Sequence, residues 1–114
     1  MRLLFDNGTP RGTAHGLPGH TVEECRAHGW DTLRNGELLD AAEAAGFDVL
    51  LTTDRNIRHQ QNLTNRKIAI VILGKGRWRL IKKRLPEVAA AVAAATPGSV
   101  TEVEIPVDTD PSRT

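Results

Sequence analysis

The sequence predicts an α/β domain built on a mainly parallel central sheet with helices on both faces. Strands predicted at 2–6, 48–52 and 68–73, from apolar runs at 3–5, 49–51 and 68–73, alternate with stretches of helical pattern, and such alternation is typical of parallel sheets. The runs lack polar residues at every second position, which indicates strands covered on both sides. The chain of 114 residues suits one domain, predicted over 1–106, followed by a polar, disordered tail at 107–114.

The first third of the chain predicts two strands separated by a short helix. After the strand at 2–6, Thr9 is expected to cap a helix that has Pro10 at its first position and runs to about Gly16. A turn then leads to a brief second strand beginning at residues 21–22. A helical turn is expected from 23 to 29, ending at a glycine.

The middle of the chain predicts a helix, a buried strand and a further helical segment. Asn35 is expected to be the N-cap of a helix over 37–45, which Gly46 ends. After the strand at 48–52, residues 56–63 are predicted to be helical, with Ile57 and Leu63 turned inward. The buried stripe of the 37–45 helix is expected to comprise Leu38, Leu39, Ala42 and Ala45.

The last third predicts a central strand, a broken helix and an edge strand. Residues 68–73 are continuously apolar and therefore central, and 74–76 form a turn. The helical pattern over 78–95 contains Pro86, which predicts two short helices or a kink. Apolar and polar residues alternate over 99–105, as expected of a final strand at the edge of the sheet.

The net charge of +1 conceals a strong asymmetry along the chain. Residues 55–86 contain ten Lys and Arg and no acidic residue, whereas 1–54 contain nine acidic residues against four basic ones. This distribution predicts a basic surface beside an acidic pocket. The alternative is a solvated helix face whose charge is balanced by neighbouring segments.

Composition excludes several classes of protein. The single cysteine, Cys25, rules out an internal disulfide and a thiolate metal cluster, and it is expected to be buried. With two Trp, two Phe and no Tyr, a base-stacking surface of the kind that single-strand binders use is not expected. The four histidines show no metal-ligand spacing. The N-terminal apolar run is too short for a signal peptide, and no segment is long enough to span a membrane, so a cytoplasmic location is predicted.

Three carboxylates are candidates for a catalytic metal site. Asp6 and Asp54 each follow an apolar strand, and the carboxyl ends of parallel strands meet at one edge of a sheet, where ligands bind. Glu37 lies at the start of the helix between them. Such oxygen ligands suit Mg²⁺ or Mn²⁺ and metal-assisted phosphodiester cleavage. The structural alternatives are an Asx turn at Asp6, a helix cap at Asp54 and an ordinary first-turn glutamate at position 37.

Polar and basic side chains near these acids are candidates for binding a substrate. Hydrogen-bonding side chains could contact phosphate, sugar or base edges, and lysines and arginines could contact a nucleic-acid backbone. A solvated linker and an ordinary basic helix are the alternatives. The candidate substrate-binding residues are Asn7, Asn56, Arg58, Gln60, Gln61, Lys82, Lys83 and Arg84.

Three stretches together resemble the small PIN-like families. They are Leu-Leu-Phe-Asp-Asn-Gly-Thr-Pro at 3–10, Asn-Gly-Glu-Leu-Leu-Asp-Ala-Ala at 35–42 and Leu-Leu-Thr-Thr-Asp-Arg-Asn at 50–56. The resemblance extends over roughly residues 2–105 and implies a Rossmann-like fold. It also implies a Mg²⁺- or Mn²⁺-dependent ribonuclease, and Asp6, Glu37 and Asp54 match the acidic positions of the family.

Some members of these families resemble the toxin half of toxin–antitoxin pairs. The resemblance therefore implies RNA as the substrate and an antitoxin protein or a second copy of the chain as partner. Relatives often have aspartate where this chain has Asn35 and Asn56. Amides coordinate metals more weakly than carboxylates, so a weakly active or inactive module that binds RNA or protein is the alternative. A receiver-like phospho-acceptor domain fits less well, because Asp6 is followed by Asn7 rather than by a second acid.

Overall fold

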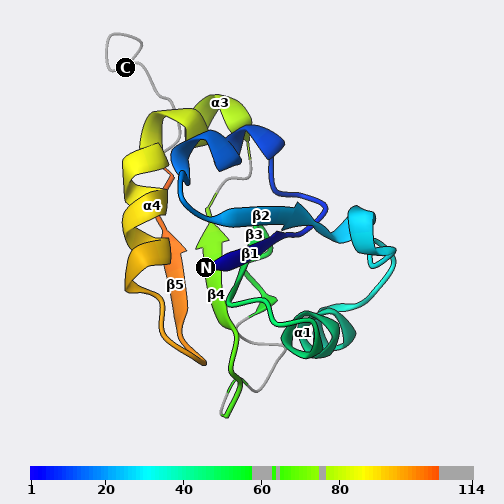
Figure 1. The fold of residues 1–114 in the computed structure, drawn as a ribbon. Coiled ribbons are helices and arrows are strands. Elements are labelled where there is room, and N and C mark those ends of the chain that lie inside the picture. Colours follow the sequence, from blue (N-terminus) through cyan, green and yellow to red (C-terminus); the bar gives the residue numbers. More distant parts are fainter. Residues whose placement is uncertain (58–62, 64, 75–76, 106–114) are drawn as a thin grey trace, which may run out of the picture.

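The computed structural model describes residues 1–57, 63, 65–74 and 77–105, and these residues form a five-stranded, fully parallel sheet (Figure 1). The strand order is β2-β1-β3-β4-β5, and every neighbouring pair is parallel. The predicted α/β class is therefore confirmed. The strands are β1 (Arg2–Phe5), β2 (Thr21–Glu24), β3 (Val49–Thr52), β4 (Ala69–Leu73) and β5 (Val100–Val103).

Helical segments cover both faces of this sheet, as predicted. One face carries the 3₁₀ helix η1, the helix α3, the 3₁₀ helix η3 and the helix α4, whereas the 3₁₀ helix η2 and the helix α1 cover the other. Their bounds are η1 (Arg11–Gly16), η2 (Cys25–His28), α1 (Asn35–Ala44), α3 (Trp78–Ile81), η3 (Lys82–Arg84) and α4 (Leu85–Ala94).

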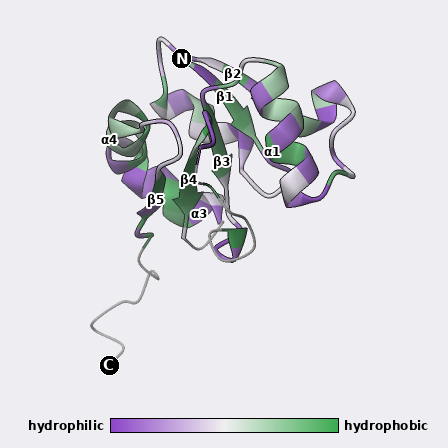
Figure 2. Ribbon diagram, turned by 90° about the horizontal axis from the view of Figure 1, so that it is seen from below, coloured by the Kyte–Doolittle hydropathy of each residue, from purple (hydrophilic) through white to green (hydrophobic). Residues whose placement is uncertain are grey.

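Two apolar cores sandwich the strands because side chains alternate between the faces of a sheet. In β1, Leu3 and Phe5 pack with buried residues of α3 and α4, whereas Leu4 packs on the opposite side with buried residues of α1. All residues of β3 and β4 are buried. Figure 2 shows these strands coloured as hydrophobic in the middle of the molecule.

The predicted order of the elements in the second half of the chain is confirmed. The strand 68–73 lies inside the sheet as β4, and the final strand forms an edge as β5. The helical stretch breaks at Arg84, so that Pro86 lies in the first turn of α4, where its missing N–H costs no helical hydrogen bond. Ile57 is buried as expected. Most of the predicted 56–63 helix and the 107–114 tail lie outside the described residues.

Two predicted helix caps are wrong. The side chains of Asn35 and Thr9 do not cap helices, and each contacts an aspartate carboxylate instead. Arg34 is the N-cap of α1, and its backbone N–H donates to Glu37 Oε1 at 3.3 Å. Asn35 is already helical and its side-chain amide reaches Asp54. Pro10, not Thr9, precedes η1, and the Thr9 hydroxyl lies within hydrogen-bonding distance of Asp6 and of a β3 carbonyl. Carboxylate and carbonyl oxygens at the ends of buried strands need hydrogen-bond donors. A short polar side chain beside them can therefore bond to them instead of capping a helix.

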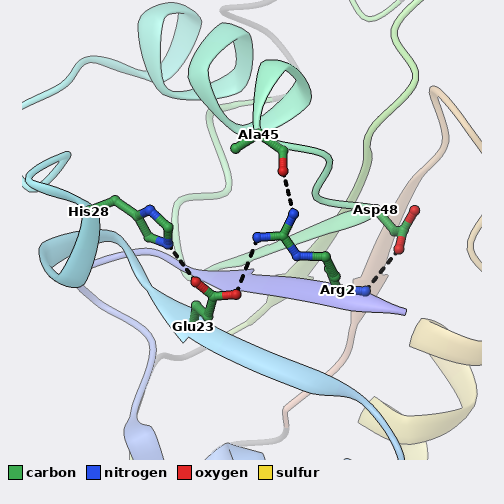
Figure 3. A network of polar contacts seen from close by, with 5 residues as sticks. All are labelled: Arg2, Glu23, His28, Ala45 and Asp48. Carbon is green, nitrogen blue, oxygen red and sulfur yellow. Dashed lines mark hydrogen bonds and ion pairs between the residues drawn. The ribbon is translucent and has the colours of Figure 1, made fainter.

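A polar network ties β1, β2 and α1 together at the amino end of the sheet (Figure 3). The Arg2 guanidinium donates to the carbonyl of Ala45 and pairs with Glu23 at 3.3 Å. Glu23 also contacts His28 Nε2 at 2.6 Å, and the Arg2 backbone N–H donates to Asp48 at 2.8 Å. The hydrogen bond with His28, although opposed by burial, lowers the pKa of Glu23 with help from Arg2. This network holds the edge strand β2 in place.

Within the described part of the chain, no helix is long and apolar enough to cross a membrane.

Candidate functional site

The strand order places a topological switch point between β1 and β3. The chain leaves β1 for β2 on one side and returns to β3 on the other. Ligands of open parallel sheets bind beyond the carboxyl ends of strands at such a point. Asp6 directly follows β1, and Asp54 follows β3 by two residues. Both aspartates therefore lie beyond the carboxyl ends of two neighbouring strands.

Asp6 is half-buried, and its carboxylate joins its own turn to β3. Oδ1 accepts a hydrogen bond from the Gly8 N–H at 3.1 Å, which is the predicted Asx turn, and lies 2.8 Å from the Thr9 hydroxyl. Oδ2 accepts a hydrogen bond from the Thr52 hydroxyl at the end of β3. One oxygen thus serves the local turn and the other links two strands.

Asp54 divides its two oxygens in the same way. Oδ1 accepts from the Asn56 N–H at 2.9 Å, the capping role that was the structural alternative for this residue. Oδ2 accepts from the Asn35 side-chain amide at 3.0 Å. Asn35 is the first residue of α1, so the amino end of that helix is close to Asp54. A second element therefore fixes the orientation of this carboxylate.

Thr52 connects the two aspartates. Its hydroxyl donates to Asp6 Oδ2 and accepts a hydrogen bond from the Asp54 backbone N–H at 3.1 Å. The side chain is only 1% exposed. A buried hydroxyl whose donor and acceptor are both used holds its partners in a fixed arrangement. The network Asp6–Thr52–Asp54–Asn35 thus joins β1, β3 and α1.

The loop after β1 packs directly on the end of β3. A Cβ atom at Gly8 would lie 2.6 Å from Thr53 Oγ1, so a larger residue at position 8 would require the Thr53 side chain or the loop to shift. Asn7 donates through its side-chain amide to the backbone carbonyl of Asp31 at 2.7 Å. In this structure the predicted substrate-binding residue Asn7 therefore anchors the segment that leads to α1.

Two other candidate side chains have structural roles. The Glu37 carboxylate is exposed and accepts from the first turn of its own helix, the ordinary alternative for a first-turn glutamate. Cys25 is buried as predicted. Burial, and next the negative charge of Asp6, raise the pKa of the Cys25 thiol to about 11. The thiol therefore remains protonated at neutral pH.

Among the described residues of the basic stretch 55–86, the cations do not lie together on one surface as the sequence predicts. Arg66 precedes β4, at the amino edge of the sheet, and pairs there with Glu43 at 2.5 Å and Asp40 at 2.6 Å. Arg55 pairs with Glu102 at 3.2 Å. Lys82, Lys83 and Arg84 follow β4 and are exposed on η3. Asn56 is exposed beside Asp54, whereas Arg58, Gln60 and Gln61 lie outside the described residues.

The donor atoms around the aspartates suit a hard divalent cation held by two carboxylates. Within 1–57, 63, 65–74 and 77–105, no group of three or more His, Cys, Asp or Glu side chains is arranged to hold a metal ion. Each carboxylate oxygen can accept two hydrogen bonds, and the described contacts leave acceptor positions on both Asp6 and Asp54. Mg²⁺ is usually bound through one or two carboxylates and several waters, so Asp6 and Asp54 are the side chains that could hold such an ion.

Sequence reasoning found the two strand-end aspartates but missed the residues that orient them. Thr52 and the amide of Asn35 both contact an aspartate from another element. A hydroxyl two residues before a strand-end acid is a signal that could have identified Thr52.

A shallow cavity of about 370 Å³ lies elsewhere, at the β2 edge, lined by Arg11, Val22, Glu23, Glu24, Arg26 and Ala27. Arg11 and Glu24 pair there at 2.7 Å.

Comparison of the chain with protein-family models, with curated proteins and with solved structures gave no match.

Proposed function

We propose that this chain is a metal-dependent ribonuclease of the PIN-like type that cleaves RNA at the carboxyl ends of β1 and β3. The observation that supports the proposal best is that two half-buried aspartates, Asp6 and Asp54, follow neighbouring strands, and that the Thr52 hydroxyl bonds to the Asp6 carboxylate and to the Asp54 backbone N–H. Hydrolysis of a phosphodiester with a divalent cation requires carboxylate oxygens gathered at one point. The sequence resemblance supports the same activity.

Each residue of the network has a role in this proposal. Asp6 and Asp54 would hold Mg²⁺ or Mn²⁺, with water completing the coordination. A cation bound there supplies an activated water and neutralises phosphate charge. Thr52 and Asn35 orient the two carboxylates, and Glu37 would lie at the rim. Lys82, Lys83 and Arg84 would attract the RNA backbone.

The test compares Asp54→Asn with the matched control Asp40→Asn. Asp40 is 73% exposed and pairs with Arg66 at the opposite edge of the sheet. With labelled RNA and Mn²⁺, Asp54→Asn should reduce cleavage at least about 100-fold, because even residues that only support metal ligands are worth 10–100-fold. Asp40→Asn should cleave like the wild type.

Calorimetry with Mn²⁺ separates this proposal from an inactive module. Wild-type protein that binds RNA but takes up no Mn²⁺ and shows no cleavage would be a binding module, and the nuclease proposal would then be wrong. If the protein cleaves RNA, the resemblance to toxins further predicts that expression of the protein slows cell growth. An antitoxin protein should then restore growth.

One observation favours a second candidate, a receiver-like phospho-acceptor. The order β2-β1-β3-β4-β5 is that of flavodoxin-like sheets, which include receiver domains, and Asp54 follows the third strand. Against this candidate, Asn7 occupies the position of a second acid and donates to a backbone carbonyl. Labelling of Asp54 by a small phosphoryl donor would favour the receiver function over the nuclease.

A further inference from the structure

Trp78 is an exposed indole in a segment whose other apolar side chains are buried. It opens α3 and is 37% exposed, whereas Leu80 and Ile81 of the same helix are buried. Among the described residues, only Met1 is a comparably exposed large hydrophobic side chain. Tryptophan is enriched at interfaces because its ring offers a large apolar face together with a polar N–H. An indole left at the surface therefore indicates a contact surface.

The backbone of η1 holds this indole in place. A Cβ atom at Gly12 would lie 2.7, 2.8 and 2.9 Å from three successive atoms of the Trp78 six-membered ring. Three nearly equal distances put that position over the face of the ring rather than beside its edge. One face of the indole therefore lies on the Gly12 backbone, and its exposed area lies away from η1. A flat surface that is already ordered loses little entropy on binding.

The side chains around Trp78 are cationic. Residues 77–84 contain five Lys and Arg and no carboxylate, and all five basic residues are exposed. Lys82 follows Trp78 by four residues, a spacing that brings side chains to the same side of a helix. Within the described residues, no ion pair involves Arg77, Lys82 or Arg84. An apolar ring surrounded by such cations complements a partner that carries both flat bases and negative charge.

The indole lies at the same edge of the sheet as the two aspartates. The segment that begins at Gly8 packs against Thr53, next to Asp54, and reaches the Trp78 ring at Gly12. Four extended residues span at most about 14 Å. A short single strand could therefore reach both places.

We propose that Trp78 stacks on a base of single-stranded RNA while Arg77, Lys82 and Arg84 contact its phosphates, beside the bond cleaved at Asp6 and Asp54. This inference rests on the proposed ribonuclease function and specifies an unpaired strand as its substrate. A stacked base is sequence-tolerant and requires an unpaired strand, because paired bases cover each other's faces. The scarcity of aromatic residues argues against the base-stacking surface that single-strand binders use, whereas this inference needs only one stacking position, at a single ordered indole.

The experiment uses the fluorescence of Trp78. In the full chain, Trp30→Phe removes the other tryptophan, which stacks on His28 on the opposite face of the sheet. A single-stranded RNA of about ten nucleotides, titrated in EDTA to prevent cleavage, should quench the emission of Trp78. A duplex of the same sequence should not quench it. Trp78→Ala should weaken single-strand binding by roughly 5- to 100-fold, and Trp78→Phe should retain most of the affinity.

The outcomes separate this inference from the proposed function. Quenching without any Mn²⁺-dependent cleavage would support the stacking surface and contradict the nuclease. Cleavage with unchanged Trp78 emission would overturn the stacking surface and leave the nuclease intact. Emission that changes with protein concentration alone would assign the surface to contact between copies and overturn the inference. Trp78→Phe keeps an aromatic ring, so equal losses of affinity in Trp78→Phe and Trp78→Ala would also overturn it.

Discussion

One threonine hydroxyl links the carboxylate of Asp6 to the backbone of Asp54, and the loss of this hydroxyl should be measurable. Thr52→Val keeps the shape of the side chain but removes the donor to Asp6 and the acceptor for the Asp54 N–H. We expect the free energy of unfolding in urea to fall by about 1–3 kcal/mol, because the Asp6 carboxylate and the partly buried Asp54 N–H each lose a hydrogen-bonding partner. Thr52→Ser keeps the hydroxyl and should lose less.

The same variants separate stability from metal binding. If Thr52 orients Asp6, Thr52→Val should lower Mn²⁺ affinity by roughly 10- to 100-fold, and Thr52→Ser should retain most of it. Equal Mn²⁺ affinities for the wild type and Thr52→Val, measured by calorimetry, would show that the hydroxyl serves the fold alone.

At the residue level, the sequence predicts which acids lie at the strand ends but not how they are held. Asp6 and Asp54 follow apolar runs, a pattern that is visible along the chain. The contact from Asn35 to Asp54 spans 19 residues and depends on where α1 begins. The sequence favours Asn35 as an N-cap, because the start of the helix is the only hydrogen-bonding partner for its side chain that lies nearby along the chain. The tertiary fold supplies a carboxylate instead.

At the level of elements, Glu43 joins the end of α1 to the start of β4. Its carboxylate accepts hydrogen bonds from Arg66 Nη1 and the Lys67 N–H, both at 2.5 Å. Burial alone would raise the pKa of Glu43, but these bonds, with one from Ile68, outweigh burial and lower it. The carboxylate therefore contributes stability above the pKa of an unfolded-state glutamate, and this contribution is lost as the pH falls through the lowered value.

This link predicts a pH-dependent stability. The free energy of unfolding should decline as the pH falls below about 5, and Glu43→Gln should decline less steeply because it has no carboxylate to protonate. Glu87→Gln, at an exposed position on α4, is the control and should follow the wild type. Urea denaturation at a series of pH values measures both slopes. Parallel curves for the wild type and Glu43→Gln would assign the acid sensitivity to other carboxylates.

The elements themselves were largely predictable, since apolar runs and one proline determine them. The strands at 2–6, 48–52 and 68–73 appear as β1, β3 and β4, and the break before Pro86 separates η3 from α4. The order of strands in the sheet could not be predicted, because it depends on which side each connection crosses. That order is what brings β1 beside β3 and creates the switch point.

At the scale of the whole molecule, the cations of the basic stretch 55–86 are divided between the amino and the carboxyl ends of the strands. Sequence reasoning groups these cations because they are contiguous, but β4 separates the cations directly before it from those after it. Arg66 and Lys67 precede β4, whereas Lys82, Lys83 and Arg84 follow it. Ion pairs with Glu43 and Asp40 offset the charge at the amino edge. The exposed cations of η3 follow β4 and lie at the carboxyl end of the strands, the end at which the proposed RNA site lies.

This division predicts the salt dependence of RNA binding. Each phosphate contact made with a single strand contributes about 0.7 to the slope of log K against log salt concentration. The triple variant Lys82→Gln, Lys83→Gln and Arg84→Gln should therefore bind more weakly and lower that slope by about 2. Lys82→Gln alone should lower it by about 0.7, whereas the matched variant Lys67→Gln, at the other edge, should leave it unchanged. If the triple variant retains the full slope, the cations of η3 serve solvation or a protein partner, and RNA must approach the aspartates over another surface.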